Sequence, residues 1–91
     1  MENKYIFKLY VYGHSSECDL ALYNLKNICK KHLNNNYEIQ LIDIEEYPNQ
    51  SEEARLIALP TLIKESPSPI RRIIGNLEDE EKVLLKLGLK F

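Results

Sequence analysis

The chain is poor in the features that mark secreted, membrane-bound and nucleic-acid-binding proteins. It has two cysteines in 91 residues, too few for the disulfide framework of a small secreted domain. No apolar run approaches the ~20 residues that a membrane-spanning helix needs. The formal net charge is −2, so no general basic field would attract nucleic acid or an acidic membrane surface. We therefore expect neither a membrane nor a nucleic acid as partner.

The N-terminal residues also lack the pattern of a secretory signal. They lead directly into a short strand-like run, without a longer apolar segment followed by small residues. The cytoplasm is therefore the expected compartment. Glycine is scarce as well, at positions 13, 75 and 88 only, and no repeat, low-complexity stretch or linker is visible. A chain of this length predicts one domain over residues 1–91, with one modest core and little room for an internal active-site cavity.

The first half of the chain predicts a strand, a helix and a second strand. Residues 5–12 are rich in β-branched and aromatic side chains and are apolar on both faces, as expected of a central strand. Residues 17–33 place apolar side chains at helical spacing, with Ser15 or Ser16 as the N-cap. Residues 37–44 are typical of a second strand. This order predicts a right-handed βαβ unit with parallel strands, similar to the opening of thioredoxin-like folds.

The second half predicts a short helix followed by a hairpin. The helix is expected over residues 49–57, with Asn49 as its cap and Glu52 at the capping-box position. Two short strands follow, over residues 61–64 and 70–74, with a proline-rich turn between them. Because so short a connection allows only a hairpin, these strands should be antiparallel. The fold class is therefore α/β. With the C-terminal helix described next, the order of elements is βαβ followed by αββα.

The C-terminal segment carries two hydrophobic patterns that conflict. Asn76 is the expected cap of a helix that begins at Leu77, and Val83, Leu84 and Leu87 recur at helical spacing. A strand-like alternation runs through the same stretch, at Leu85, Leu87, Leu89 and Phe91. Both patterns cannot be satisfied at once. The segment is either a helix with a partly extended hydrophobic tail, or part of a second half that adopts two structures of similar energy.

The cysteines are placed wrongly for dithiol redox chemistry. Thioredoxin-like enzymes carry C-x-x-C where the first strand meets the first helix, and this chain has serine at the first position and Cys18 at the last. Cys18 is either a helix residue without a role or a monothiol nucleophile, since helix N-termini stabilise thiolates. Cys29 lies ~16 Å further along the same helix, too far for a disulfide, and is expected in the core.

Neither histidine predicts a metal or catalytic site. Cys29 and His32 are three residues apart on a helix and supply two ligands at most, whereas zinc sites need three or four. His14 stands in the strand–helix loop without a partner nucleophile and is expected to be solvated. We therefore expect no metal site and no cofactor, and no catalytic histidine.

Arg71 and Arg72 are the most prominent basic feature of the chain. Neighbouring residues of a strand point to opposite faces, so the pair does not form a one-sided phosphate clamp. The two side chains are either simply solvated or form a docking patch for an acidic protein surface, because guanidinium groups bind carboxylates well. Arg55 and Lys64 are candidates to extend such a patch.

Four sequence blocks make the chain resemble the KaiB family of cyanobacterial clock proteins over nearly its whole length. The proline–arginine block, P-x-P-x-R-R-I-I-G, is the most specific of them. The blocks are Lys8-Leu9-Tyr10-Val11 followed by Gly13, Leu59-Pro60-Thr61-Leu62, residues 67–75, and Glu81-Lys82-Val83-Leu84.

The resemblance implies a non-enzymatic regulator, in circadian rhythm or in stress adaptation, that binds a KaiC-type ATPase ring. It also implies fold switching between a thioredoxin-like fold that engages the ATPase and a ground state in which about residues 48–91 fold differently. The expected assembly is a homo-oligomer, either a dimer or a tetramer. A sensor histidine kinase or another clock-like protein stays open as a further partner, and a monothiol redox protein using Cys18 is the alternative function.

The resemblance also assigns roles to individual residues. The expected partner-binding residues match aromatic or basic positions of the family: Tyr5, Arg55, Lys64, Arg71 and Arg72. The expected switch residues are Pro60, Pro67, Pro69 and Gly75. The Leu59–Pro60 bond stands where thioredoxin-like folds usually carry a cis proline.

Overall fold

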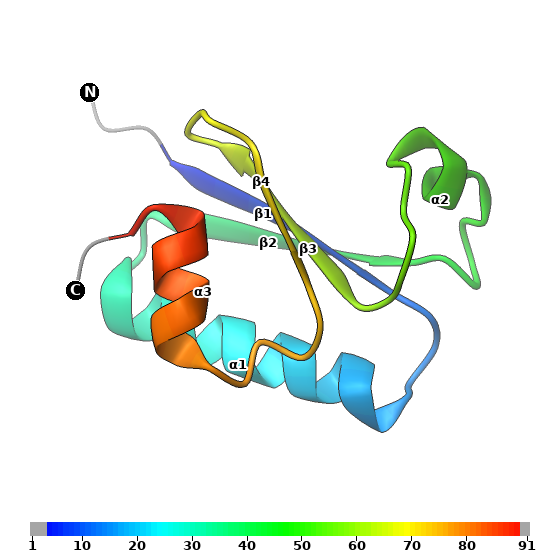
Figure 1. Ribbon diagram of the computed structural model, residues 1–91, viewed down its shortest axis with the longest axis horizontal. Helices are drawn as coiled ribbons and strands as arrows, with labels where there is room; N and C mark the ends of the chain where they lie inside the picture. The colour runs from blue at the N-terminus through cyan, green and yellow to red at the C-terminus, as the bar shows by residue number, and fades with distance from the viewer. Residues whose placement is uncertain (1–3, 90–91) are drawn as a thin grey trace.

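The computed structural model describes residues 4–89, which form a single sheet with helices on both of its faces (Figure 1). No helix in this range is both long and apolar enough to cross a membrane. The predicted order of elements is confirmed. In chain order these are β1 (Tyr5–Val11), α1 (Ser16–His32), β2 (Tyr37–Asp43), α2 (Asn49–Glu53), β3 (Thr61–Ser66), β4 (Arg71–Ile74) and α3 (Glu80–Leu87).

The sheet has the strand order β2-β1-β3-β4, so β1 lies inside it. β1 pairs with β2 in parallel, with Tyr5 opposite Tyr37, and with β3 in the antiparallel direction, with Leu9 opposite Leu62. β3 and β4 form the predicted antiparallel hairpin. The central place of β1 explains why both of its faces are apolar, because helices cover the sheet on each side.

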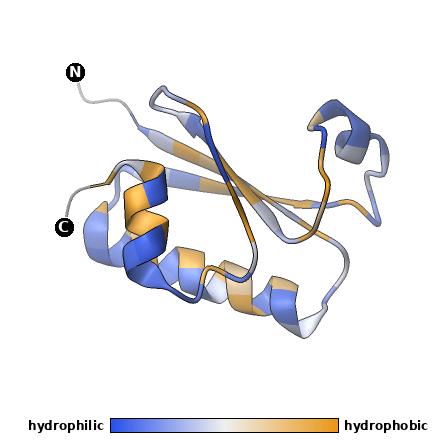
Figure 2. Cartoon of the chain, in the orientation of Figure 1, coloured by the Kyte–Doolittle hydropathy of each residue, from blue (hydrophilic) through white to orange (hydrophobic). Residues whose placement is uncertain are grey.

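The main core lies between the sheet and the helix pair α1 and α3. Phe7, Leu9 and Val11 of β1 point to this side and pack against buried residues of both helices. Figure 2 shows the hydrophobic residues of α1 and α3 on the sides that face the sheet. A smaller cluster around Tyr10 and Ile63 lies on the other face, beneath α2 and the loop that follows it. The two clusters match the two faces predicted for β1.

α1 forms close to its predicted limits because its local signals agree with its packing. The side chain of Ser15 is the N-cap, and its Oγ accepts a hydrogen bond of 3.2 Å from the backbone N–H of Cys18. Leu25 and Cys29 are fully buried on the inner side, as their helical spacing predicts. Lys31 and His32 stand in the last turn, where positive charge complements the helix dipole.

α2 is shorter than predicted, and its expected cap is wrong. The N-cap position is Pro48, whose own φ and ψ of −60° and −28° are already helical, so Asn49 lies inside the first turn and makes no side-chain cap. The helix ends early because Arg55 takes a left-handed conformation with φ 54°. α2 therefore spans Asn49–Glu53 and not residues 49–57.

The start of the last helix is also a correction. α3 begins at Glu80 with Asp79 as its N-cap, and not at Leu77 with Asn76. The Oδ1 atom of Asn76 accepts a 3.0 Å hydrogen bond from the N–H of Glu78, which makes a turn of the loop instead of capping a helix. Leu77, with φ 63°, is buried from this loop at 5% exposure. An apolar residue therefore reaches the core without belonging to the helix.

The helical pattern at the C-terminus is the one that this structure satisfies. Val83, Leu84 and Leu87 are buried, whereas Leu85, which only the strand pattern would place inside, is 69% exposed. Gly88 ends the helix in a left-handed conformation with φ 74°, which glycine adopts without strain. Phe91 lies outside the described residues.

The prolines around the hairpin share one backbone feature. The Leu59–Pro60 bond is cis, as is usual at this position of thioredoxin-like folds. The Ser66–Pro67 and Ser68–Pro69 bonds are cis as well. Pro60 directly precedes β3, and the other two prolines occupy the loop between β3 and β4.

Candidate functional site

The arginine pair of β4 is divided between the two faces of the sheet. Arg71 stands opposite Lys64 in the hairpin, on the side of the sheet that α1 and α3 cover. Arg72 stands opposite Ile63, on the side of α2. This confirms the inference that the two arginines do not form a one-sided clamp. The predicted partner-binding residues consequently fall into two groups.

The first group, on the α2 side, brings Arg55 and Arg72 together. The guanidinium of Arg72 donates to the carbonyl oxygen of Ala54 and, at 3.3 Å, to that of Arg55. Arg72 thereby holds the chain after α2 against the sheet. Both arginines line a groove of about 310 Å³ that also contains Ile57, Ile74 and Lys86.

The sequence did not indicate that Ile57, Ile74 and Lys86 belong to this groove. Ile57 and Ile74 are 87% and 52% exposed, and Lys86 approaches the groove from α3. An exposed isoleucine has no signature in the sequence, because the same residue type fills strands and cores. We call these five residues, Arg55, Ile57, Arg72, Ile74 and Lys86, the α2-side groove.

The second group, on the opposite face, surrounds a buried lysine. Lys64 is only 4% exposed, and its Nζ atom donates a 3.2 Å hydrogen bond to the carbonyl of Leu87 at the end of α3. The same amine lies 6.0 Å from the centre of the Tyr5 ring, within reach of a cation–π contact. Burial, and secondly the charge of Arg71, hold the pKa of Lys64 below its ordinary value. In this structure Lys64 therefore caps α3 and does not extend the Arg55–Arg72 surface.

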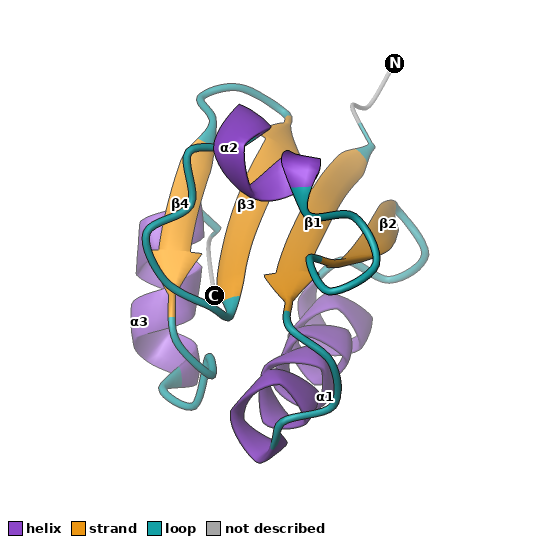
Figure 3. Cartoon of the chain, turned by 90° about the vertical axis from the view of Figure 1, so that its right-hand side faces the viewer, coloured by secondary structure: helices purple, strands orange, loops and turns teal. Residues whose placement is uncertain are grey.

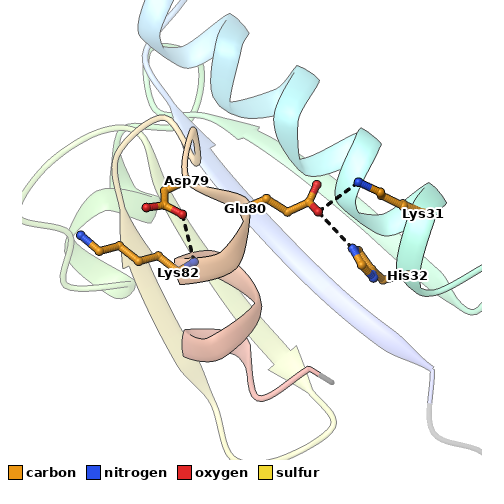
Figure 4. Close-up of polar contacts among 5 residues, drawn as sticks. All are labelled: Lys31, His32, Asp79, Glu80 and Lys82. Atoms are coloured by element: carbon orange, nitrogen blue, oxygen red, sulfur yellow. Dashed lines mark hydrogen bonds and ion pairs between the residues drawn. The ribbon is translucent and has the colours of Figure 1, made fainter. Parts of the chain in front are cut away.

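A charged cluster ties the end of α1 to the start of α3, as Figure 4 shows. Glu80 Oε2 lies 3.2 Å from Lys31 Nζ and 3.3 Å from His32 Nε2. Hydrogen bonds from Lys31 and then from His32 hold the pKa of Glu80 below its ordinary value. Next to it, Asp79 Oδ1 accepts a 3.3 Å hydrogen bond from the backbone N–H of Lys82 and caps the helix. Sequence analysis missed this cluster because the two helix ends are far apart in the chain.

Glu80→Gln is expected to lower the melting temperature at neutral pH, because it removes the charged partner of Lys31 and His32. Since the folded-state pKa of Glu80 is lowered, its contribution is present above the unfolded value of about 4.3 and is lost as pH falls through the folded value. The gap between variant and wild type should therefore close in acid. Thermal denaturation followed by circular dichroism across this range measures it. Glu81→Gln, an exposed neighbour, is the control, and a gap that does not depend on pH would contradict the assignment.

The two cysteines are free thiols with buried side chains. Cys18 is 4% exposed and Cys29 is fully buried, and burial raises the pKa of Cys29 to about 12. His14 is solvated, as predicted, and its Nδ1 lies 3.6 Å from Asp19 Oδ1. The monothiol alternative needs an accessible sulfur at Cys18, and the small exposure of this residue does not favour it. Within residues 4–89, no three His, Cys, Asp or Glu side chains gather as a metal site would require.

Cys29 should not react with a thiol reagent such as Ellman's reagent while the protein is folded. Only the thiolate is nucleophilic, and the raised pKa and complete burial of Cys29 suppress both its formation and its access. The Cys18→Ser variant isolates Cys29, and its labelling is compared in buffer and in denaturant. Labelling in buffer as fast as in denaturant would show that α1 does not pack as described.

Comparison with protein families and curated proteins gives consistent matches over almost the whole chain. The family model described as "KaiB domain" matches residues 8–89. "Circadian clock protein KaiB3" of Synechocystis sp. is 39% identical over 87 residues, covering 96% of this chain and 85% of that protein. "Circadian clock oscillator protein KaiB" of Synechococcus elongatus is 45% identical over 87 residues, with the same coverage of 96% and 85%.

Comparison with solved structures shows the fold. The N-terminal domain of Synechococcus elongatus SasA superposes with a TM-score of 0.73 at 21% identity, covering 97% of this chain and 87% of that one. Chloroplastic thioredoxin z gives a TM-score of 0.71 at 18% identity, covering 96% and 81%. At these identities the likeness concerns the fold alone, and it confirms the predicted thioredoxin-like α/β class.

Proposed function

The chain belongs to the KaiB family of circadian clock proteins, and from this premise we propose that it is a non-catalytic regulator that binds a KaiC-type ATPase ring. Its place of action in this proposal is the cytoplasm, in rhythmic timing or in stress adaptation. A sensor histidine kinase or another clock-like protein is proposed as a further partner. The observation that carries the proposal is the α2-side groove, where cations and exposed isoleucines lie together.

The groove has the mixed character of a protein-binding surface. Arg55, Arg72 and Lys86 bring positive charge to it, and its described lining contains no carboxylate. Ile57 and Ile74 leave large apolar side chains in water, which a partner would cover. Arginine and apolar residues are enriched at the centre of interfaces, and complementary charge steers the encounter. An acidic patch on a protein partner fits this surface better than a small molecule does.

We further propose that the second half, about residues 48–91, exchanges this fold for a KaiB-type ground state that assembles as a dimer or tetramer. Two observations support it. α3 has eight residues, too few for a helix to be stable alone, so it depends on tertiary contacts such as those of Glu80 and Lys64. Leu85 satisfies the competing strand pattern but is exposed here. The proposed switch residues lie at the ends of the hairpin strands: Pro60, Pro67, Pro69 and Gly75.

The Arg55→Glu/Arg72→Glu variant should bind the cognate KaiC-type ATPase at least about tenfold more weakly than wild type, because two groove cations become carboxylates. Size-exclusion chromatography and pull-down with ATP present measure the complex. Incubation must be long, since a binding-competent fold that is rarely populated reduces apparent affinity.

Lys26→Glu/Lys30→Glu, on the exposed side of α1, is the matched control for this experiment, because it changes the net charge by the same amount. Circular dichroism of each variant separates a lost contact from a lost fold, because Arg72 also holds the chain after α2. Unchanged binding by the double variant would remove the groove from the proposal. Absence of any complex with wild type after prolonged incubation would overturn the proposed function itself.

A further inference from the structure

β4 is the edge strand of the sheet, and the loop between α2 and β3 runs past it on the α2 side (Figure 3). Its neighbour in the strand order is β3, and none of the strands formed by residues 4–89 pairs with its other edge. Figure 3 shows β4 at the border of the sheet, with α2 on one face and α3 on the other. An edge strand presents backbone N–H and C=O groups that an additional strand can pair with. The backbone of β4 is therefore a template for a fifth strand of this sheet.

Hollows flank this edge on both faces. On one face lies the α2-side groove, and on the other a groove of about 610 Å³ separates β4 from α3. Ile73, Ile74 and Lys86 line both of them, so the two hollows meet along β4. An extended chain placed against β4 would direct alternate side chains into the two grooves, because the side chains of a strand alternate between faces.

The α2-side groove is lined by cations without a carboxylate, and the larger groove is lined by two lysines and two carboxylates. Arg55 and Arg72 lie on the α2 side, Lys82 on the α3 side, and Lys86 belongs to both. The carboxylates of the larger groove, Glu78 and Asp79, precede α3 in the loop after β4, and Asp79 is engaged as the cap of α3. The hollow along the strand itself therefore favours an incoming segment with carboxylate side chains on both of its faces.

The same charges argue against a second copy of this chain as the occupant. Arg71 and Arg72 occupy half of the four positions of β4. Pairing two copies of β4 edge to edge brings like charges opposite each other in every register that aligns the arginines, and this disfavours those registers. Charged edge residues protect a strand against self-association, but that protection alone does not account for the exposed Ile57 and Ile74 beside it.

We propose that the free edge of β4 binds an extended acidic segment of a partner protein by strand addition. Carboxylates of the segment contact Lys82 and Lys86 on one side and Arg72 on the other, and its apolar side chains cover Ile57 and Ile74. The inference rests on the proposed function, since it names the chemistry of the segment that the α2-side groove would receive. The inference extends the proposed binding surface from the α2-side groove to the backbone of β4 and to the groove between β4 and α3.

The test uses a labelled eight-residue peptide of sequence Glu-Glu-Val-Val-Glu-Glu-Val-Val, which in a strand places glutamate and valine on both faces. It is titrated against the full chain and followed by fluorescence anisotropy. We expect saturable binding and slower hydrogen exchange at the β4 amides when the peptide is bound. A peptide with lysine in place of glutamate should not bind. A glutamate–valine peptide N-methylated at every residue should bind at least about tenfold more weakly, because neither of its edges can then donate hydrogen bonds to β4.

The protein variant for this test is Lys82→Glu/Lys86→Glu, with Lys26→Glu/Lys30→Glu as the matched control. Both pairs are exposed and four residues apart on a helix. The first should weaken peptide binding at least about tenfold, and the second should leave it unchanged. Equal weakening by both variants, or equal binding of the N-methylated peptide, would overturn the inference. Light scattering tests for a dimer of this chain. If a dimer forms, the Lys82→Glu/Lys86→Glu change weakens it and the peptide does not bind, then the edge of β4 binds a second copy and the inference is wrong.

The two proposals fail separately in this design. If the ATPase complex forms but the acidic peptide neither binds nor competes with it, the strand-addition inference is wrong and the proposed function stands. If the peptide binds and no ATPase complex forms, the edge is a docking site and the proposed function is wrong.

Discussion

Leu84→Ala should lower the free energy of unfolding by about 2–5 kcal/mol, whereas Leu85→Ala should change it by less than about 0.5 kcal/mol. The two leucines are neighbours of the same type in the same helix, but Leu84 is 2% exposed and Leu85 is 69% exposed. Truncating Leu84 removes buried methyl groups and leaves a cavity between α3 and the sheet. Truncating Leu85 removes surface that water already covers.

Urea denaturation of both variants, followed by circular dichroism, measures the two changes. The pair also decides between the two hydrophobic patterns of the C-terminal segment. In the helical pattern Leu84 faces the core, and in the strand pattern Leu85 shares a face with Leu87. A Leu85→Ala change as costly as Leu84→Ala would show that the segment does not adopt α3 in solution.

Lys64→Glu should lower the free energy of unfolding by up to about 3–5 kcal/mol, because it places a negative charge in a buried site. The exposed Arg71, which stands opposite Lys64 in the hairpin, offsets part of this cost. The amine of Lys64 is a donor to the carbonyl of Leu87, so a carboxylate there would face another acceptor. Lys64→Met keeps the apolar stem beside Tyr5 but loses the hydrogen bond, and should cost only about 1–3 kcal/mol. Thermal and chemical denaturation of the two variants measure this difference.

The same variants test the role that the family resemblance assigns to Lys64. If Lys64 were a surface contact for the partner, Lys64→Glu would retain its stability and lose binding. If it caps α3, as this structure places it, stability falls and any loss of binding follows from the loss of the helix. A Lys64→Glu protein as stable as wild type would contradict the buried position.

The extent of successful prediction differs between the two halves of the chain for a physical reason. In the first half, local signals and tertiary packing agree: Ser15 caps α1, its apolar spacing faces the sheet, and β1 is apolar on both sides because helices cover both. In the second half they disagree. The buried Leu77 has an apolar side chain that suggested a helix, yet it reaches the core from a loop. Spacing alone does not distinguish these cases.

The candidate site divides in the same way. The period of a strand was enough to predict that Arg71 and Arg72 lie on opposite faces, since that depends only on neighbouring residues. The meeting of Arg72 with Arg55 depends on where the chain after α2 lies. The burial of Lys64 depends on where α3 ends. Neither the contact of Arg72 with Arg55 nor the burial of Lys64 can be predicted from the local spacing of residues.

The scarcity of cysteine, of long apolar runs and of net charge thus gave only expectations about the classes of protein to exclude, whereas the sequence blocks indicated the family that the comparisons show. Element order followed from periodicity, because each strand or helix has a local pattern. Only the tertiary structure decided the structural roles of Lys64 and Glu80 and the place of β4 at the edge of the sheet. These roles arise between segments far apart in the chain, where contact depends on how the helices and strands pack and not on the residues next in sequence.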